Sequence, residues 1–316
     1  MNIGAGAVIC GAGQPRAVRP MPTQLLINAK SGAVLRSGVE HCRELIRAHC
    51  PDEIVELVGP PEELISAARA AADNPAIDKV MLIGGDGTAA AVAGALAGSS
   101  TVFAPLPGGT MNMLARDLGY SGDLETAIGE LSRARRTRID VAYVNDLPFL
   151  NNVVFGTFTV AAESREAIRD AATLTETASA TADFISAVAT SDPQDYDLVI
   201  DGAAQSVRTN TLMIANNLYT GSESFRPTKH SLEAGILGVY IAEAQGAIDF
   251  LAVIYNAISG NLSQTEGVTL RECKACSVAS KQKRLNLTID GEVTELSSPA
   301  LFSIKPKALT VLSLVP

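Results

Sequence analysis

The feature that most constrains this chain is a short apolar run that ends in a glycine loop. The run Val80–Ile83 is followed by the loop Gly84–Thr88, which reads Gly-Gly-Asp-Gly-Thr, and then by an alanine-rich stretch. Such a run is typical of a central strand in a parallel sheet, and the alanine-rich stretch predicts a helix packed on that sheet. The loop is therefore expected at a helix N-terminus, where unpaired N–H groups and the helix dipole favour an anion.

Asp86 is the unusual member of this loop, because a carboxylate repels a phosphate. Its presence implies a divalent cation between the two charges, or a proton that has to be removed. A plain strand-to-helix turn, whose glycines only meet the demands of the backbone, explains a single loop of this kind equally well. Other parts of the chain have to separate these alternatives.

Two more predicted strands end in small polar residues and glycine. Val102–Leu106 predicts a strand that runs into a second glycine loop, Pro107–Asn112, and Gln24–Ile27 predicts a strand that runs into Asn28–Gly32. In a doubly wound sheet such loops open at the carboxyl edge, where ligands bind. Within the second loop, Thr110 is placed to bind a nucleotide, and an N-cap role is its simpler explanation.

Taken together, these segments resemble the diacylglycerol kinase catalytic family, which includes bacterial lipid kinases, sphingosine kinases and ceramide kinases. The matching pieces come in the family's order and span the chain from about residue 24 to the C-terminus; they are Asn28–Gly32, Gly84–Thr88, Pro107–Arg116, Asn216-Asn217 with a following glycine, and Asp290-Gly291-Glu292. The Gly-Gly-Asp-Gly-Thr loop alone is shared with nicotinamide dinucleotide kinases. The resemblance therefore rests on the whole set.

The composition is that of a globular enzyme and argues against other classes. The chain has 316 residues, 47% of them hydrophobic and 19% charged, which is enough for two domains with cores of their own. A net charge of −9 argues against a nucleic-acid partner. No apolar run approaches the length of about 20 residues that a helix needs to cross a bilayer. The five cysteines suit a reducing compartment, and Cys273 and Cys276, which have the spacing of half a zinc site or a redox pair, are expected to be plain strand residues.

The first half of the chain alternates short apolar runs with helical patterns. Strands are expected near 24–28, 53–58, 79–83 and 102–106, and helices near 35–49, 61–73, 88–97, 111–118 and 123–133. This order predicts an α/β nucleotide-binding domain with a doubly wound parallel sheet. The last helix is expected to end in a cluster of arginines between 133 and 138, interpreted as a solvated C-cap, with anionic lipid headgroups as the alternative partner.

From Ile139 the pattern changes to closely spaced strands. They are expected near 139–144, 149–154, 196–201, 206–215, 239–243, 271–280, 284–290 and 308–315, with a helical segment over 163–190. Such a series predicts a β-rich antiparallel sandwich domain. The expected organisation is a disordered extension over 1–22, an ATP-binding domain over 23–140 and a lipid-substrate domain over 141–305. Residues from about 306 to 316 would pack back on the first domain, and the active site would lie in the cleft between the two.

The resemblance implies an ATP-dependent lipid kinase, which transfers the γ-phosphoryl group to a lipid hydroxyl. That chemistry needs phosphate-binding N–H groups, Mg²⁺ and a carboxylate near the acceptor oxygen. Asp86 is the expected Mg²⁺ ligand, directly or through water. The expected cofactor-binding residues are Asn28, Ser31, Gly32, Gly84, Gly85, Asp86, Gly87, Thr88, Gly108, Gly109, Thr110 and Asn112.

Three acidic residues are candidates for the base that activates the acceptor hydroxyl. The resemblance assigns this role to the Asp290-Gly291-Glu292 segment, in which we expect Glu292 to accept the proton and Asp290 to assist or to exchange roles with it. A hairpin turn is the simpler explanation for the Asp-Gly pair alone. Asp86 is the third candidate, because some family members are described with that role there.

The chain departs from the family pattern at three places. Ala89–Ala91 stand where the family commonly has an asparagine or glutamate, and Val58-Gly59 replaces a threonine used in some members. Ser231–Gly235 stands where many bacterial members have an Asp-Gly pair that helps to bind a structural Mg²⁺. We therefore do not expect that structural metal site here.

The nucleotide motifs leave the acceptor open between diacylglycerol, ceramide and a sphingoid base. Phe155, Phe158, Phe184, Tyr219 and Phe225 could line an acyl-chain pocket, although core packing explains any one of them. Because no membrane-spanning helix is predicted, the protein is expected in the cytoplasm, docked peripherally on the inner face of the membrane. A homodimer is also possible on this sequence. A kinase of a soluble substrate such as NAD, and a catalytically silent lipid- or nucleotide-binding relative, are the alternatives.

Overall fold

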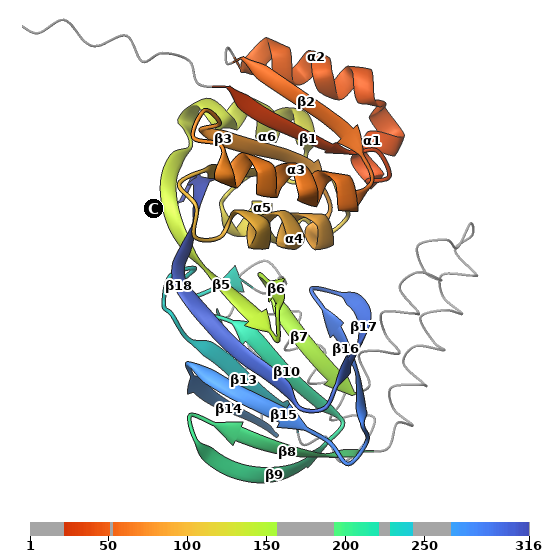
Figure 1. Ribbon diagram of the computed structural model, residues 1–316, viewed down its shortest axis with the longest axis vertical. Helices are drawn as coiled ribbons and strands as arrows, with labels where there is room; N and C mark the ends of the chain where they lie inside the picture. Colours follow the sequence, from red (N-terminus) through yellow and green to blue (C-terminus); the bar gives the residue numbers. More distant parts are fainter. Residues whose placement is uncertain (1–21, 51–52, 157–192, 221–227, 243–266, 316) are drawn as a thin grey trace, which may run out of the picture.

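The computed structural model describes residues 22–50, 53–156, 193–220, 228–242 and 267–315, and all structural statements below concern these residues. Figure 1 shows an upper part in which strands lie among helices and a lower part built of strands. The predicted fold class is confirmed, since a parallel sheet with helices on both faces is followed by antiparallel sheets. The helical segment expected over 163–190, and all but the last residue of the extension expected over 1–22, lie outside the described residues.

The elements of the upper part follow in the order of a doubly wound sheet. They are β1 (Thr23–Asn28), α1 (Gly32–Ser37), α2 (Val39–His49), β2 (Ile54–Gly59), α3 (Pro61–Asp73), β3 (Lys79–Gly84), α4 (Asp86–Leu96), β4 (Val102–Pro107), α5 (Met113–Asp117), α6 (Leu124–Glu130) and a 3-10 turn, η1 (Leu131–Arg133). The helix expected over 35–49 is divided in two, because Gly38 has a φ of 84°.

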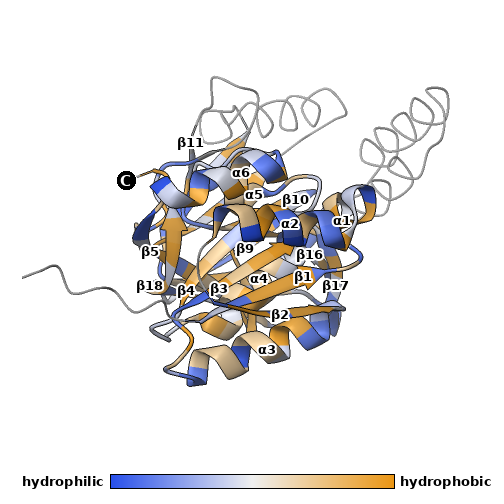
Figure 2. Ribbon diagram, turned by 90° about the horizontal axis from the view of Figure 1, so that it is seen from above, coloured by the Kyte–Doolittle hydropathy of each residue, from blue (hydrophilic) through white to orange (hydrophobic). Residues whose placement is uncertain are grey.

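The parallel strands lie in the order β2-β1-β3-β4. Leu26 of β1 pairs with Leu57 of β2 on one side and with Leu82 of β3 on the other. Strands β3 and β4 are buried along almost their whole length, as expected for a sheet that is covered on both faces. Seen from above, α3 lies on one face of the sheet and α2 and α6 lie on the other (Figure 2). The loops after β1, β3 and β4 therefore leave neighbouring strands at one edge.

The lower part consists of strands with short connections. They are β5 (Arg135–Val144), β6 (Leu147–Phe149), β7 (Asn152–Gly156), β8 (Gln194–Ile200), β9 (Ala203–Thr209), β10 (Thr211–Asn216), β11 (Tyr219–Thr220), β12 (Thr228–Lys229), β13 (Leu237–Ala242), β14 (Val268–Cys273), β15 (Ala275–Ala279), β16 (Arg284–Ile289), β17 (Glu292–Ser297) and β18 (Ala300–Ser313). One sheet has the order β14-β13-β10-β7-β16-β17. It packs on the antiparallel half of the larger sheet through Phe149, Phe155 and Phe302, whose rings meet edge to face.

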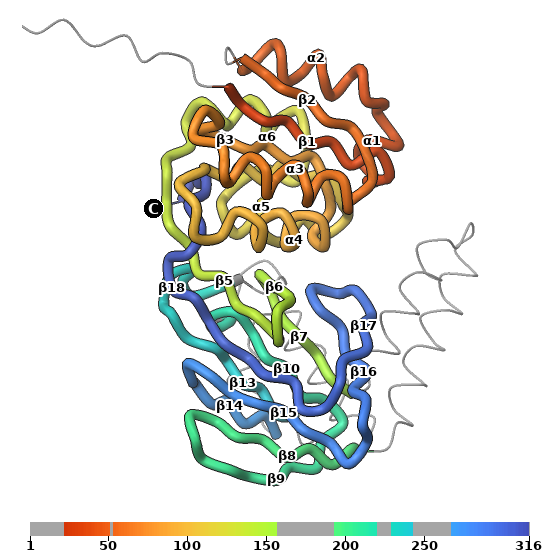
Figure 3. Tube along the Cα trace, in the orientation of Figure 1, coloured from red at the N-terminus to blue at the C-terminus, as the bar shows by residue number. Residues whose placement is uncertain are grey.

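Strands β5 and β18 belong to both parts of the molecule (Figure 3). Near its C-terminal end β18 pairs in parallel with β4, with Thr310 beside Val102, whereas its other half pairs antiparallel with β15. Along its length it also pairs antiparallel with β5, with a shift of register between Lys305 and Leu309. The parallel sheet thus continues without interruption into the antiparallel strands β15, β8 and β9.

Several predicted boundaries were wrong. The arginine cluster does not end a helix, because Arg135, Arg136 and Arg138 lie in β5, where Arg136 forms an ion pair with Asp78. The strands expected over 206–215 and 271–280 are each two strands, and the one expected from Ala308 already begins at Ala300. Among the described residues, no helix combines the length and the apolar character needed to cross a membrane.

Candidate active site

The three predicted loops meet at the carboxyl edge of the parallel sheet. The backbone N–H of Ala33 donates to the carbonyl oxygen of Gly108 (2.8 Å). The N–H of Gly108 in turn donates to the carbonyl oxygen of Gly84 (3.0 Å). Beneath them, the Asn28 amide donates to the Thr88 hydroxyl (3.0 Å), which ties the loop after β1 to the first turn of α4. The loops therefore form one connected surface.

The glycines in these loops are needed first for the contact between the loops themselves. A Cβ atom on Gly108 would lie 2.5 Å from the backbone nitrogen of Gly84, and one on Gly109 would lie 2.8 Å from the Cα of Gly85. Both distances are shorter than van der Waals contact, and backbone atoms cannot turn away as a side chain can. The close approach of a phosphate, which the sequence predicted as the reason for these glycines, would be a second demand on the same residues.

We expect Gly108→Ala to lower the free energy of unfolding by about 1 to 3 kcal/mol, the usual cost of forcing an extra carbon into a packed site. Gly85→Ala is the matched control, because its added Cβ would meet nothing closer than 3.7 Å. Urea titration of both variants measures the difference. Equal stability of the two would contradict the contact between the loops.

The second glycine loop is held by its own asparagine. Asn112 accepts a hydrogen bond from the Gly109 N–H (2.7 Å) and returns one from its amide to the Gly109 carbonyl (3.0 Å). Its φ of 50° is left-handed, which ends the loop and delays α5 until Met113. Asn112 is buried, whereas Thr110 is exposed. Of these two predicted nucleotide-binding side chains, only Thr110 is open to a ligand.

Asp86 caps a helix other than its own. It is the first residue of α4, and its Oδ1 accepts a hydrogen bond from the N–H of Met113, the first residue of α5 (2.6 Å). Burial raises the pKa of Asp86, while hydrogen bonds from the backbone of Asn112, Met113 and Leu114 oppose that rise. The carboxylate in this loop therefore has a structural partner within the protein, and the cation or proton that the sequence predicted stays a prediction.

Asp290 lies at the tip of the hairpin between β16 and β17. Asp290 and Gly291 have φ angles of 48° and 91°, the two left-handed conformations of a tight type I′ turn. The carboxylate accepts hydrogen bonds from three successive backbone N–H groups, those of Leu150 (2.8 Å), Asn151 (2.8 Å) and Asn152 (3.0 Å). Burial nevertheless raises the pKa of Asp290 to about 6. The hairpin-turn interpretation is thus correct for the backbone, and the carboxylate at its tip is partly buried, with a pKa close to the neutral range.

Glu292, two residues later, brings the hairpin against the first glycine loop. A Cβ atom on Gly87 would lie 1.8 Å from Glu292 Oε1, so the carboxylate rests directly on the glycine. The same two parts of the molecule also meet where Gly94 of α4 packs against Pro148 of β6. The structure therefore brings the acidic segment of the β part to the loop that carries Asp86.

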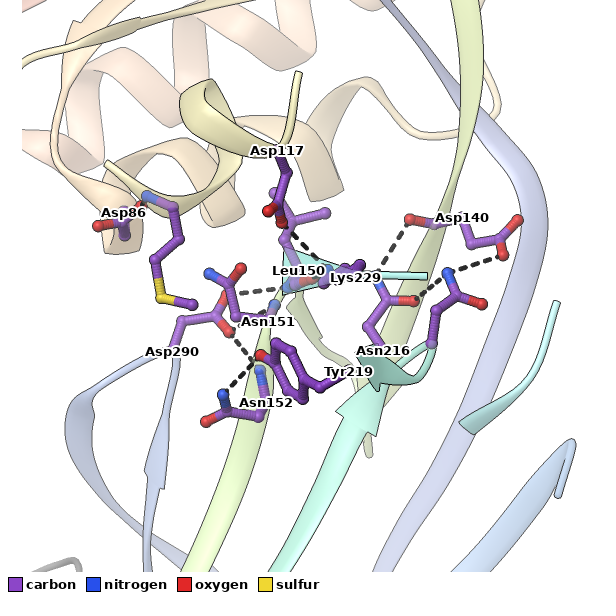
Figure 4. A network of polar contacts seen from close by, with 12 residues as sticks. Asp86, Asp117, Asp140, Leu150, Asn151, Asn152, Asn216, Tyr219, Lys229 and Asp290 are labelled. Atoms are coloured by element: carbon purple, nitrogen blue, oxygen red, sulfur yellow. Dashed lines mark hydrogen bonds and ion pairs between the residues drawn. The ribbon is translucent and has the colours of Figure 1, made fainter. Parts of the chain in front are cut away.

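Two charged residues at this junction were missed by the sequence analysis (Figure 4). Lys229 of β12 extends between Asp117 of α5 and the carbonyl of Leu150, and its side chain is only 2% exposed. Its ammonium lies 3.9 Å from Asp117 Oδ2. Burial raises the pKa of Asp117 to about 6, against the opposing effect of Lys229. Residues 117 and 229 are far apart in the sequence, and β12 has only two residues, so no local pattern marked the pair.

Asp140 is a third residue that was missed, and its role is structural. It is 1% exposed and accepts hydrogen bonds from the Asn217 amide (3.0 Å), the Gly235 N–H (2.7 Å) and the Lys307 N–H (2.7 Å). Lys307 has a φ of 50° and lies in the irregular stretch of β18. Asp140 therefore fixes the point at which β5 and β18 pass from one part of the molecule to the other.

The raised pKa values predict how stability depends on pH. Asp117 and Asp290 both have a pKa near 6 in the folded protein, above the usual value of an aspartate in an unfolded chain, about 3.9. The folded state then binds more protons between these values, so these two groups lower the free energy of unfolding as the pH rises from about 4 to about 6. We expect this slope to be shallower in Asp117→Asn, measured by urea titration at several pH values; an unchanged slope would contradict the raised pKa.

Other predicted residues have plainer roles. Phe155 lies in the core between the two sheets, and Tyr219 is buried with its hydroxyl accepting a hydrogen bond from Asn152 (2.9 Å), so neither lines an open pocket. Phe158, Phe184 and Phe225 lie outside the described residues. Cys273 and Cys276 are buried, free cysteines in β14 and β15.

The residues at the junction suit a magnesium-bound nucleotide better than a metal held by protein alone. The N-terminus of α4 has no side-chain cap, and the Ser31 hydroxyl is buried without a hydrogen-bond partner, which leaves donors for phosphate oxygens. Within the described residues, no three acidic, histidine or cysteine side chains gather closely enough to hold an ion. Mg²⁺ needs no such cage, since it is usually bound by one or two carboxylates together with phosphate and water.

Comparison with known proteins agrees with this arrangement. Residues 22–144 match the diacylglycerol kinase catalytic domain, and residues 153–313 match the YegS C-terminal NAD kinase beta sandwich-like domain. An uncharacterised protein of Synechocystis is 24% identical over 308 residues, which cover 91% of this chain and 69% of that protein. A Cronobacter sakazakii protein described as "Probable lipid kinase YegS-like" is 34% identical over 140 residues, which cover 42% of this chain and 45% of that one.

Solved structures show the same fold over nearly the whole chain. A diacylglycerol kinase from Bacillus anthracis superposes with a TM-score of 0.66 at 19% identity, over 93% of this chain and 97% of that one. A second structure from the same organism has the same coverage, with a TM-score of 0.70 at 21% identity. With both family domains present in order, the chain belongs to the diacylglycerol kinase catalytic family and is a kinase of that type.

Proposed function

We propose that the protein is an ATP-dependent lipid kinase that transfers the γ-phosphoryl group to the hydroxyl of a membrane lipid. The observation that carries the proposal is the contact of Glu292 with Gly87, which brings the acidic hairpin of one domain to the glycine loop of the other. Phosphoryl transfer needs this combination of phosphate-binding amides and a nearby carboxylate. Bound Mg²⁺ would supply neutralisation of phosphate charge, and Asp86 is the residue that would hold it.

In this proposal the roles of the three candidate carboxylates differ. Asp290 is the better placed of the hairpin pair to accept the proton of the acceptor hydroxyl, because its pKa near 6 is matched to proton transfer at neutral pH and three backbone N–H groups fix its position. Glu292 is exposed and lies on the loop, where it would orient the acceptor. This assignment reverses the preference for Glu292 that the sequence suggested.

The nucleotide would lie on the connected loops. The uncapped N–H groups of α4 would bind phosphate oxygens, and Thr88 would donate its hydroxyl hydrogen, since its oxygen already accepts from Asn28. Gly85 and Gly109 allow the backbone to approach the ligand, and the exposed Thr110 would contact it from the second loop.

The lipid acceptor is supported by the family and by the name of the Cronobacter sakazakii relative. A lipid substrate implies that the cleft docks on a membrane surface, and we propose peripheral contact on the cytoplasmic face. Diacylglycerol, ceramide and a sphingoid base all carry the required hydroxyl.

The proposal is tested by a phosphorylation assay with labelled ATP and Mg²⁺. The acceptor is offered as mixed micelles of diacylglycerol, ceramide or sphingosine, and NAD is offered separately. We expect labelled product with at least one lipid and none with NAD. Product on NAD alone would replace the lipid kinase by a soluble-substrate kinase. No product in any arm, with labelled ATP still bound, would indicate a catalytically silent relative.

A further inference from the structure

Lys229 is a buried cation at the boundary between the two domains. It comes from β12, which pairs with β11, and its side chain is 2% exposed. Burial lowers its pKa, while Asp117, Asp290 and Asp140 act in the opposite direction. A lysine that is buried so completely needs its partners, because an unpaired charge away from water is costly.

The first partner of Lys229 belongs to the nucleotide-binding domain. Asp117 is the last residue of α5, the helix whose first N–H is bound by Asp86. Its Oδ2 is buried and has no hydrogen-bond partner, so the Lys229 ammonium 3.9 Å away is its compensating charge. Asp140, by contrast, is satisfied by three donors of its own. Lys229 and Asp117 therefore depend on each other.

The second partner belongs to the segment that holds Asp290. The Lys229 ammonium donates to the carbonyl oxygen of Leu150, which also accepts a hydrogen bond from the Asn216 amide (3.2 Å). The N–H groups of Leu150 and the next two residues are the ones that bind the Asp290 carboxylate. The segment Leu150–Asn152 is therefore bound on two sides: the Leu150 carbonyl accepts from Lys229, and the three backbone N–H groups donate to Asp290 (Figure 4).

We propose that Lys229 is a positioning residue for phosphoryl transfer, which ties α5 of the nucleotide-binding domain to the Leu150–Asn152 segment and so fixes Asp290 relative to the glycine loops. This inference rests on the proposed function for its effect on catalysis. The ammonium acts through its neighbours, since it is too deeply buried to meet a substrate. Its charge also acts to lower the pKa of both Asp117 and Asp290.

The variant Lys229→Met removes the charge and keeps the length of the side chain. We expect kcat to fall about 10- to 100-fold, as when a group that orients a catalytic residue is lost, and KM for ATP to stay within about 2-fold, because the glycine loops are unchanged. Lys281→Met is the matched control, since Lys281 is 86% exposed. We expect wild-type kinetics from it.

The pH profile separates positioning from a general loss of structure. The titratable side chains that face Asp290 within the described residues are Lys229 and Tyr219, and burial keeps Tyr219 neutral by raising its pKa. Loss of the ammonium removes a charge that lowers the pKa of Asp290, so the acid limb of kcat/KM moves to higher pH in Lys229→Met. Lys229→Arg keeps the charge and is expected to keep the acid limb in place. A merely destabilised protein would show the wild-type limb.

A double-mutant cycle provides a readout that needs no turnover. We expect the effects of Asp117→Asn and Lys229→Met on the urea midpoint to be non-additive, with the double variant more stable than the two single effects together predict, because each single change leaves the other charge without its partner. If the wild type transfers no phosphate to any acceptor, the proposed function fails while this cycle still tests the link. Additive effects in the cycle, or a Lys229→Met enzyme with wild-type kcat and acid limb, would overturn the inference.

If Lys229→Met does not fold, the kcat values of Asp117→Asn and Lys229→Arg provide the test instead. Wild-type kcat in both of these variants would overturn the inference.

Discussion

Asp290→Asn is expected to reduce lipid phosphorylation by about 100- to 10,000-fold, the contribution of a positioned general base. An asparagine has the shape of the aspartate, and its one amide oxygen can still accept the hydrogen bonds from the N–H groups of Asn151 and Asn152, but it loses the bond from Leu150 and cannot take up a proton. Initial rates with saturating ATP and lipid measure the loss. Near-ultraviolet circular dichroism of the variant establishes that the hairpin still packs.

Glu292→Gln is the matched control for this variant. It changes the other carboxylate of the hairpin, which is exposed and rests on Gly87. We expect a smaller effect, mainly on KM for the lipid, since Glu292 would orient the acceptor. A large loss of kcat in Glu292→Gln together with an active Asp290→Asn would return the role of base to Glu292.

Asp86→Ala is expected to show two separable losses. Activity should fall at least about 100-fold, because the residue that would hold Mg²⁺ is gone. Stability should fall by about 1 to 3 kcal/mol, because the partly buried N–H of Met113 loses its acceptor. Initial rates over a range of Mg²⁺ concentrations and urea titration measure the two effects.

Asp86→Asn separates them, since its amide oxygen can still accept from Met113 while the charge is lost. We expect stability close to that of the wild type and activity close to that of Asp86→Ala. Wild-type activity in the asparagine variant would mean that Asp86 serves only as a cap for α5.

The nucleotide-binding half was the easier part to predict. β1, β3 and β4 are buried runs that end in glycine loops, and both signals are local, so strand positions were correct to within a residue or two. Parallel strands in sequence order place their carboxyl ends at one edge. The meeting of Asn28 with Thr88 follows from that rule.

The contacts between the domains could not be predicted in this way. Asp117 and Lys229 come from a five-residue helix and a two-residue strand, and neither has enough residues to show a period. β5 was partly mistaken for the end of a helix, because its arginines are favoured both at a helix C-terminus and on the solvent face of a strand. The family resemblance placed the Asp290-Gly291-Glu292 segment near the cleft, but it did not reveal what holds Asp290 there.

The sharing of β18 between the two domains sets the order in which the protein can be completed during synthesis. β4 has β3 on one side, and its other neighbour is β18, which is made after all the other described strands of both sheets. Until then the parallel sheet has an open, apolar edge, which is exposed to wrong pairing while the intervening chain is made. We expect a fragment that ends before Ala300 to aggregate when it is expressed alone.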